Sequence, residues 1–406
     1  MTGPSNERMR AWVEVDLEAL RANFLRLRER SGPRHGVLPV VKADAYGLGA
    51  GRVVRELEGL GPWGFGVATA DEGAALRRSG YGRPILVLAP LAPGSEGLAA
   101  ESRLTPAISD LDALDRFAAA AADEPGLAFH VDVDTGMGRS GFPDRDAARW
   151  AAEVAARASD RVRWTGVCTH FHSADAVDPG SAAAQWRRFQ AALAAVRAAI
   201  PPQAAGGVGA VGRPPGGGPF GLVVHAASGV AALRWPEFAA DVVRPGFTLY
   251  GGWPPVLDGA GAEVPRPVPV VSVRARVALV RDVGPGATAG YGATHAAPSG
   301  GARWATVTLG YGDGLPRRLG NRGRMLVRGR AAPIVGRVSM DLAVLDVSRV
   351  PGVRAGDVAT MIGRDGEEEI SLAEVARHAG TIGYEVLTGL AGRLPRVDVG
   401  GGPAHG

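Results

Sequence analysis

Lysine is almost absent from this sequence. The chain carries 45 lysine and arginine residues, and Lys42 is the only lysine among them. Arginine can replace lysine in a surface charge, a salt bridge or a phosphate contact, but its guanidinium stays protonated in proteins and cannot act as a nucleophile. Any chemistry that needs a side-chain amine is therefore confined to Lys42.

Cysteine and long apolar segments are scarce as well. A single cysteine, Cys168, excludes an internal disulfide and a cysteine-rich metal site. No apolar run reaches the roughly 18 residues that suggest a membrane-spanning helix, and the opening MTGPSNERMR lacks the apolar core of a signal peptide. We therefore expect a cytoplasmic protein that does not bind membranes.

Charge of one sign is not concentrated in any stretch. The 45 basic and 41 acidic residues are interspersed, and the net charge is only +4. Because no basic patch forms, nothing in the sequence indicates nucleic-acid binding. A chain of 406 residues, 46% of them hydrophobic, can bury a sizeable core, and its length suggests two or three domains.

The first 250 residues alternate between strand-like and helical patterns. A strand at 12–16 precedes a helical spacing that puts Leu17, Leu20, Phe24 and Leu27 on one face. Eight βα-type units within about 210 residues predict an α/β fold with a (β/α)8 barrel of the TIM type, although a doubly wound sheet would read similarly. Their apolar runs are the one ending at Lys42, 65–69, 85–89, 105–108, 128–134, 162–171, 222–228 and 242–247.

Two Gly/Pro-rich stretches divide the rest of the chain. Residues 202–221 predict a flexible surface insertion, and residues 251–268 mark a domain boundary. Beyond this boundary, strands alternate with tight turns, as in VPVVSVRARVALV, which predicts a mostly antiparallel β domain. We expect the barrel at 12–250, with its first strand able to pack on the β domain, and the β domain at 262–398.

Lys42 stands at the carboxyl end of a short apolar run, and Gly47 and Gly49 open the loop beyond it. Catalytic groups of a βα barrel lie at this end of its strands. A lysine there fits a Schiff-base role with pyridoxal phosphate (PLP) as cofactor, whereas a leftover structural lysine is the plain alternative.

His170 and His172, in CTHFH, suggest a different class of function. Two residues apart on a strand, they would point to one face, where a His-x-His pair can bind a metal. A barrel metallohydrolase is therefore an alternative. The sequence lacks a matching carboxylate–histidine set, and it has no second lysine that could bridge two metals.

The segment VVKADAYGLGA resembles the signature around the PLP lysine of alanine racemases, and further segments resemble this family along residues 12–398. The resemblance implies interconversion of L- and D-alanine, which supplies D-alanine for peptidoglycan. Racemisation needs two acid–base groups on opposite sides of the reacting carbon. The resemblance assigns them to Lys42 and to Tyr291 of TAGYGATH. In the family this tyrosine enters the partner's active site, which implies a head-to-tail homodimer. A serine or broad-specificity racemase is the closest alternative.

The resemblance also implies roles for the remaining site residues. Arg139 would bind the substrate carboxylate, helped by the backbone N–H of Met340, and Arg244 would hydrogen-bond the pyridine nitrogen. A contact chain from Tyr291 through His170 to Arg244 would lower the pKa of the tyrosine. The further expected cofactor contacts are Tyr46, Ser228, Gly229, Gly246, Phe247 and Tyr384, and the supporting residues are Asp132, Tyr311 and Asp341.

Four positions depart from the family pattern. Asp132 stands where the family commonly has a carboxylated lysine that steadies the substrate-binding arginine, and a direct carboxylate could supply the same charge to Arg139. Ser228 and Gly229 replace the usual Asn-Ser pair at the phosphate. The RxPR ending is present at 393–396, but Asp398 stands near a position where tyrosine is common.

Overall fold

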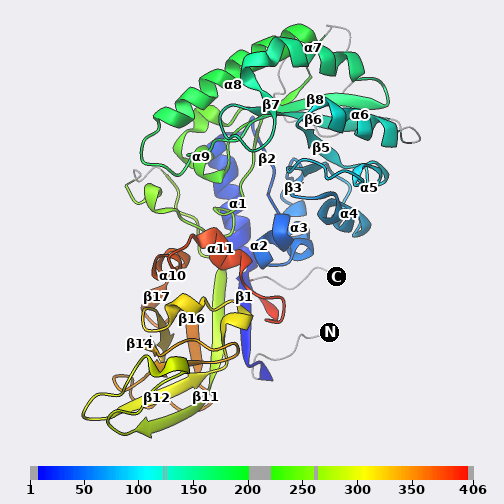
Figure 1. Cartoon of the computed structure of the whole chain (residues 1–406). Helices are drawn as coiled ribbons and strands as arrows, with labels where there is room; N and C mark the ends of the chain where they lie inside the picture. The colour runs from blue at the N-terminus through cyan, green and yellow to red at the C-terminus, as the bar shows by residue number, and fades with distance from the viewer. Residues whose placement is uncertain (1–7, 122–123, 125, 201–220, 260–263, 401–406) are drawn as a thin grey trace.

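The computed structural model describes residues 8–121, 124, 126–200, 221–259 and 264–400, so most of the insertion expected at 202–221 lies outside the described residues. The chain forms two parts, which Figure 1 shows one above the other. The upper part is a barrel of strands and helices. The lower part is mostly β-structure.

The barrel strands run in parallel. One sheet follows the order β3 (Phe65–Val67), β4 (Ile85–Val87), β5 (Thr105–Ile108), β6 (Leu127–Asp134), β8 (Val162–Cys168) and β9 (Val223–His225), while β10 (Val242–Val243) pairs with β2 (Gly36–Val37). Bridges between Val40 and Gly66 and between Ser228 and Arg244 connect the two sets. The described residues thus form a curled sheet of eight parallel strands, and the expected TIM-type fold is confirmed.

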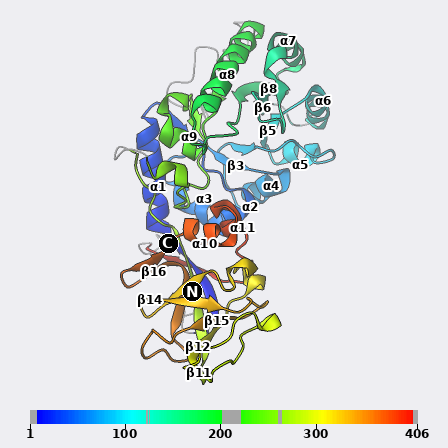
Figure 2. The ribbon, with the colours of Figure 1, turned by 60° about the vertical axis from the view of Figure 1, so that its left-hand side comes forward.

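Helices cover the outside of this sheet (Figure 2). They are α1 (Leu17–Ser31), α3 (Ala50–Glu58), α4 (Ala70–Arg78), α5 (Glu96–Glu101), α6 (Leu111–Ala120), α7 (Ala147–Arg157), α8 (Gly180–Ala199) and α9 (Gly229–Arg234). Several begin at a side-chain cap; Asp16, for example, accepts a hydrogen bond from the Ala19 N–H at 2.8 Å. Leu20, Phe24 and Leu27 of α1 are buried, as their spacing predicts. The described helices include none long and apolar enough to cross a membrane.

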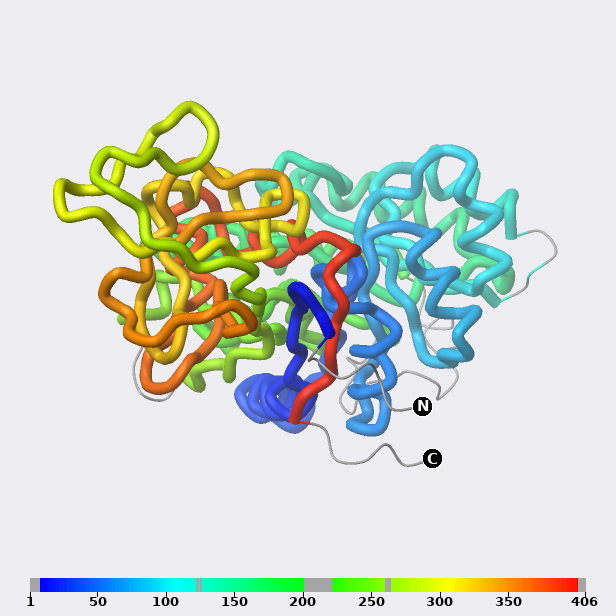
Figure 3. Tube along the Cα trace, turned by 90° about the horizontal axis from the view of Figure 1, so that it is seen from below, coloured from blue at the N-terminus to red at the C-terminus, as the bar shows by residue number. Residues whose placement is uncertain are grey.

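The lower part is the expected mostly β domain. Its described strands follow the order β17 (Glu368–Ile370), β16 (Val358–Asp365), β13 (Arg324–Val327), β14 (Arg330–Val335), β15 (Ala343–Asp346), β12 (Ala302–Val307), β11 (Val271–Val283), β1 (Ala11–Asp16) and β18 (Arg396–Val399). The first strand of the chain, β1, belongs to this sheet, antiparallel to β11 and parallel to β18. Figure 3 shows β1, in dark blue, beside β18, in red.

Helices α10 (Leu372–Ala379) and α11 (Gly383–Thr388) lie between the sheet and the barrel (Figure 1). Helix α11 contacts the α2 segment (Lys42–Gly47), and the ring of Tyr384 stacks on Phe247 with 4.1 Å between centroids. The last part of the chain therefore helps to cover the carboxyl end of the barrel.

Candidate active site

A cavity of about 770 Å³ opens at the carboxyl ends of the barrel strands. Active sites of this fold lie at that face. The cavity gathers most of the residues that the sequence singles out, from strands far apart in the chain. Those that line it are Lys42, Tyr46, Asp132, Arg139, His170, His172, Ser228, Gly229, Arg244, Gly246, Phe247 and Tyr384. Tyr291, Tyr311, Met340 and Asp341 do not line it.

Lys42 begins an unusual backbone segment. The next four residues, Ala43 to Tyr46, all have left-handed helical geometry, with φ between 51° and 57° and ψ between 36° and 50°. Such geometry costs non-glycine residues about 1–2 kcal/mol each, so a run of four persists only where the surroundings hold it. The turn directs Lys42 and Tyr46 into the same cavity.

The surroundings of Lys42 favour its neutral amine. Burial lowers the pKa of the Lys42 ammonium, and the nearby charges of Arg139 and Arg244 lower it further, while the carboxylate of Glu72 raises it in part. An amine that loses its proton more readily is a better nucleophile and can act as a base. The direction of this shift is the one that a Schiff-base role would need.

Arg244 is buried at the back of the cavity and held in one orientation. Its guanidinium donates hydrogen bonds to the carbonyls of Thr169 (2.8 Å) and Ala226 (3.1 Å) and to Nδ1 of His225 (2.8 Å) and His170 (3.3 Å). Since a guanidinium only donates, both imidazole nitrogens must accept. The expected contact between His170 and Arg244 is thus present.

The imidazoles around Arg244 are neutral. Burial and the charge of Arg244 lower the pKa of both His170 and His130 to about 3. His225, whose Nδ1 accepts from Arg244, has its proton on Nε2 and donates it to Nδ1 of His130 at 2.7 Å. Neither His130 nor His225 is expected from the sequence as a site residue, although His225 lies within the predicted strand 222–228 and ends β9.

The cavity that holds Lys42 also contains a cradle for an anion. A Cβ on Gly229 would collide with Oγ1 of Thr248, and one on Gly246 would collide with the Tyr46 hydroxyl, so the backbone comes very close at both positions. The Thr248 hydroxyl lines the cavity, is buried and has no hydrogen-bond partner among the described residues. An unpaired buried hydroxyl beside glycine backbone and the Ser228 hydroxyl fits a phosphate group. The residues present therefore fit PLP.

Asp132 does not contact Arg139 directly. Its carboxylate accepts a hydrogen bond from the Ser140 hydroxyl at 2.9 Å and from the Cys168 thiol at 3.8 Å, and no hydrogen bond or ion pair within the described chain joins it to Arg139. Burial raises the pKa of Asp132, against the effects of Ser140 and of the two arginines. The charges of Asp132 and Arg139 therefore interact at a distance, and the direct hydrogen bond is to the neighbouring Ser140.

The other expected site residues form a second cluster on the β domain. Tyr291 lies between β11 and β12 with 71% of its surface exposed, and Met340 is 53% exposed. Tyr311 and Leu342 are exposed large side chains of the same domain, and the Tyr311 N–H donates to the Ser339 carbonyl at 3.0 Å. Within one chain, Tyr291 is not brought to the Lys42 cavity.

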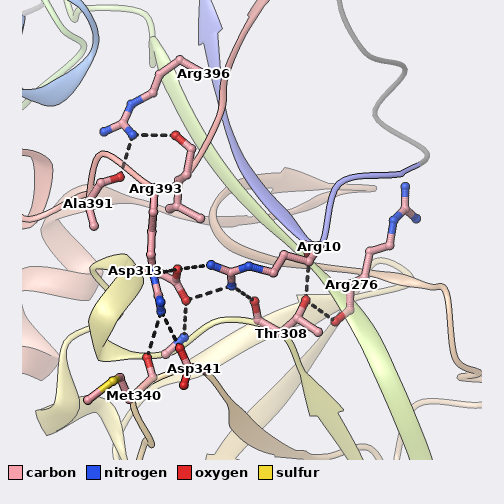
Figure 4. A network of polar contacts seen from close by, with 11 residues as sticks. Arg10, Arg276, Thr308, Asp313, Met340, Asp341, Ala391, Arg393 and Arg396 are labelled. Atoms are coloured by element: carbon pink, nitrogen blue, oxygen red, sulfur yellow. Dashed lines mark hydrogen bonds and ion pairs between the residues drawn. The ribbon is translucent and has the colours of Figure 1, made fainter.

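A polar network supports this second cluster (Figure 4). The fully buried Asp313 accepts hydrogen bonds from Arg10 (2.6 Å), Arg393 (2.7 Å) and the Gly310 N–H (3.0 Å). Arg393 also donates to the Asp341 carboxylate at 2.8 Å. The arginine of the RxPR ending thus anchors the Met340–Asp341 loop. Asp398, in the same ending, forms an ion pair with Arg52.

The expectation that His170 and His172 share one face of a strand is wrong. Strand β8 ends at Cys168, before both histidines, so neither of them lies on a strand. His170 binds Arg244, whereas Nδ1 of His172 contacts the Ser173 hydroxyl. The described residues contain no group of three His, Cys, Asp or Glu side chains that could hold a metal. The part of the chain that the structure describes therefore offers the metallohydrolase alternative no ligand set.

Comparison with known proteins gives a consistent result. The family models for the N-terminal and C-terminal domains of alanine racemase match residues 15–254 and 270–398. A curated alanine racemase from Syntrophobacter fumaroxidans is 37% identical over 380 residues, which cover 93% of this chain and 94% of that one.

Solved structures are similar over nearly the whole chain. The alanine racemase from the D-cycloserine producer Streptomyces lavendulae has a TM-score of 0.86 and 34% identity, with 97% of this chain and 98% of that chain covered. The enzyme from Bacillus anthracis, solved with bound L-Ala-P, has a TM-score of 0.83 and 32% identity, with 96% and 95% covered.

Proposed function

The chain belongs to the alanine racemase family, and on that premise we propose that it interconverts L- and D-alanine with PLP as its cofactor. One observation carries the proposal beyond similarity. The only lysine of the chain lies in the same cavity as a buried guanidinium, Arg244, and an unpaired buried hydroxyl, Thr248. These are the groups needed to hold the aldehyde, the ring nitrogen and the phosphate of PLP.

Different residues of the cavity would bind different groups of the cofactor. Lys42 would hold the cofactor and act as the acid–base group on one face of the substrate, while Ser228, Gly229, Gly246 and Thr248 would bind the phosphate. Tyr46, Phe247 and Tyr384 would pack around it. Burial raises the pKa of Tyr384 to about 12, so its hydroxyl stays protonated and can donate to the phosphate.

Bound PLP would withdraw electrons from the α-carbon of the amino acid and make its hydrogen acidic. Arg244 would limit this withdrawal, because a guanidinium donates a hydrogen bond to the ring nitrogen without giving up its proton. A weaker electron sink favours return of the proton to the α-carbon and so favours racemisation over transamination. Arg139 has no hydrogen bond or ion pair within the described chain and would bind the substrate carboxylate, with Asp132 holding the adjacent Ser140.

The acid–base group for the opposite face would come from a second copy of the chain. Tyr291, Tyr311, Met340 and Leu342 are large side chains left exposed on the β domain. A head-to-tail homodimer would cover them and bring Tyr291 into the partner's cavity, where the neutral His170 could hydrogen-bond it. Met340 and Asp341 would reach the same entrance, the Met340 N–H to help bind the carboxylate.

Mixed dimers test this arrangement. Lys42→Ala and Tyr291→Phe are each expected to inactivate the protein by removing one face of the site. If the sites are shared, mixing the two variants under conditions of subunit exchange restores activity, since each mixed dimer has one site with both residues intact. Restoration without subunit exchange, or none after exchange is verified by mass, would contradict shared sites.

The reaction itself is tested with PLP-loaded protein in deuterated water. Incubation with L-alanine and, separately, L-serine would be followed by chiral chromatography and mass analysis. We expect fast formation of α-deuterated D-alanine and little reaction of serine. Comparable rates would support the broad-specificity alternative. No exchange with either substrate would contradict the proposed activity.

We also propose the domain boundaries and the setting of the reaction. The barrel would span 12–250 and the β domain 262–398, which agrees closely with the matched ranges 15–254 and 270–398. The reaction would take place in the cytoplasm and supply D-alanine for peptidoglycan.

A further inference from the structure

We propose that Glu72 is a positioning residue that holds Lys42 in place by bracing the left-handed turn that follows it. Its two carboxylate oxygens bind two different backbone segments. Oε1 accepts the Ala43 N–H at 2.7 Å, and Oε2 accepts the Ala68 N–H at 2.7 Å. Ala43 is the residue directly after Lys42, and Ala68 directly follows β3. One side chain thus joins the Lys42 turn to the neighbouring barrel strand.

The simplest explanation of Glu72 is a helix cap, and its geometry departs from that explanation. Thr69 and Glu72 have the T-x-x-E spacing of a capping box, in which the glutamate reaches back to the backbone N–H of the capping threonine. The Thr69 hydroxyl does accept the Glu72 N–H at 3.3 Å. The Glu72 carboxylate instead extends past Thr69 to Ala68 and across to Ala43. The Thr69 half of the capping box is therefore present, whereas the Glu72 carboxylate binds backbone N–H groups outside the helix.

The left-handed turn needs support at both of its ends. At its far end, the Asp44 side chain accepts the Ala50 N–H at 2.7 Å, and the Asp44 carbonyl accepts the Gly49 N–H at 2.9 Å. At its beginning, Glu72 is the partner of the Ala43 N–H. Without this contact the unfavourable geometry of Ala43 would lose its nearest restraint, and the Lys42 side chain would lose its defined direction.

The Glu72 carboxylate also interacts electrostatically with the Lys42 amine. The other charged groups that act on the amine are Arg139 and Arg244, which both lower its pKa, as burial does, while Glu72 raises it. His170, which also senses Lys42, is neutral. Loss of the Glu72 charge therefore leaves only influences that lower the pKa of Lys42, which gives the bracing role a local readout.

The test uses the fact that Lys42 is the only lysine. Full-length protein labelled with isotopic lysine gives one side-chain amine signal, whose titration is followed by NMR in the cofactor-free form. Glu72→Gln keeps the shape but removes the charge and one acceptor. The matched control is Asp71→Asn, which removes the same charge from the adjacent exposed residue. A second control, Thr69→Ala, weakens the cap of α4 without removing either Glu72 contact.

In Glu72→Gln we expect the titration midpoint of Lys42 to move to lower pH. We also expect kcat with alanine to fall roughly ten- to a hundredfold at nearly unchanged KM, because a misplaced reacting group costs rate. Both controls should leave the midpoint in place. An unmoved midpoint or an unchanged kcat in Glu72→Gln would overturn the inference. If this variant does not fold, Glu72→Asp, which keeps the charge but shortens the reach, should lower kcat while leaving the midpoint nearly unmoved; an unchanged kcat would overturn it.

The kinetic part rests on the proposed racemase function, but the two can fail separately. A wild-type protein without racemase activity whose Lys42 midpoint still moves in Glu72→Gln would refute the proposed function and leave the bracing contact standing. An active wild-type protein whose Glu72→Gln variant behaves like Asp71→Asn would do the reverse.

Discussion

Replacing Thr248 by valine should have opposite effects on the cofactor-free and the cofactor-bound protein. Thr248 is only 1% exposed, and its hydroxyl has no hydrogen-bond partner among the described residues. A buried hydroxyl without a partner costs about 1–3 kcal/mol of stability, and an apolar group of the same shape avoids that cost. The cofactor-free Thr248→Val protein should therefore be at least as stable as the wild type.

Binding of PLP should weaken in the same variant. A hydrogen bond to a charged group contributes about 1.5–3 kcal/mol, which corresponds to a roughly 10- to 150-fold increase in Kd for PLP when the phosphate loses this donor. The stabilisation that PLP gives at a fixed concentration should fall accordingly, because it depends on the ratio of free ligand to Kd. The sign of the effect thus differs between the two forms.

Two measurements test whether Thr248 binds the phosphate. Thermal unfolding of cofactor-free protein gives the stability of each variant, and equilibrium titration with PLP gives Kd. Ser109→Ala is the matched control, since the Ser109 hydroxyl is also buried without a described partner but does not line the cavity. It should leave the Kd for PLP unchanged. An unchanged Kd in Thr248→Val, or a clear loss of stability without cofactor, would refute the assignment of Thr248 to the phosphate.

Three further predictions concern the two ends of the site. Lys42→Arg should abolish covalent attachment of PLP after borohydride reduction, checked by mass, and lower racemase activity by at least roughly 10²-fold; a labelled protein would exclude the Lys42 assignment. Tyr291→Phe should slow removal of the proton from L-alanine by roughly 10²–10⁴-fold with little change in binding, checked by α-deuterium exchange, and normal exchange would remove Tyr291 from the mechanism. Asp313→Asn should lower stability by about 1–3 kcal/mol in urea unfolding at pH 7. Burial raises the pKa of Asp313, but hydrogen bonds from Arg10, Gly310 and Arg393 outweigh it and keep the pKa below its usual value. The wild-type advantage over Asp313→Asn should therefore be full above about pH 4 and disappear as the pH falls further; a difference that persists in acid would contradict the role of the carboxylate.

Sequence patterns predicted the parts of this protein that repeat. The alternation of strands and helices predicted the barrel, and the end of the apolar run predicted the position of Lys42 at its carboxyl face. Single contacts between distant segments carry no such periodic signal. The contact from Glu72 to Ala43 spans 29 positions, and the T-x-x-E motif would have placed the Glu72 carboxylate on its own helix.

The left-handed backbone geometry after Lys42 could not be predicted from the sequence either. Propensities predict right-handed helix or strand for residues such as Ala43 and Ala45, because left-handed geometry is unfavourable for both. Their left-handed turn exists only because groups around it accept and donate the backbone hydrogen bonds. The His170–His172 pair was misplaced because the apolar run continues to Phe171, whereas β8 ends at Cys168.

The solitary lysine can now be explained by the groups around it. Arg139 and Arg244 already place two permanent positive charges near position 42, and an arginine there would add a third that no change of pH could remove. A lysine at the same place can give up its charge, because burial and both arginines favour its neutral form. Glu72 opposes this tendency in part and holds the turn that aims the amine. Under the proposed function, position 42 needs a group that can lose its proton, which a lysine provides and an arginine does not.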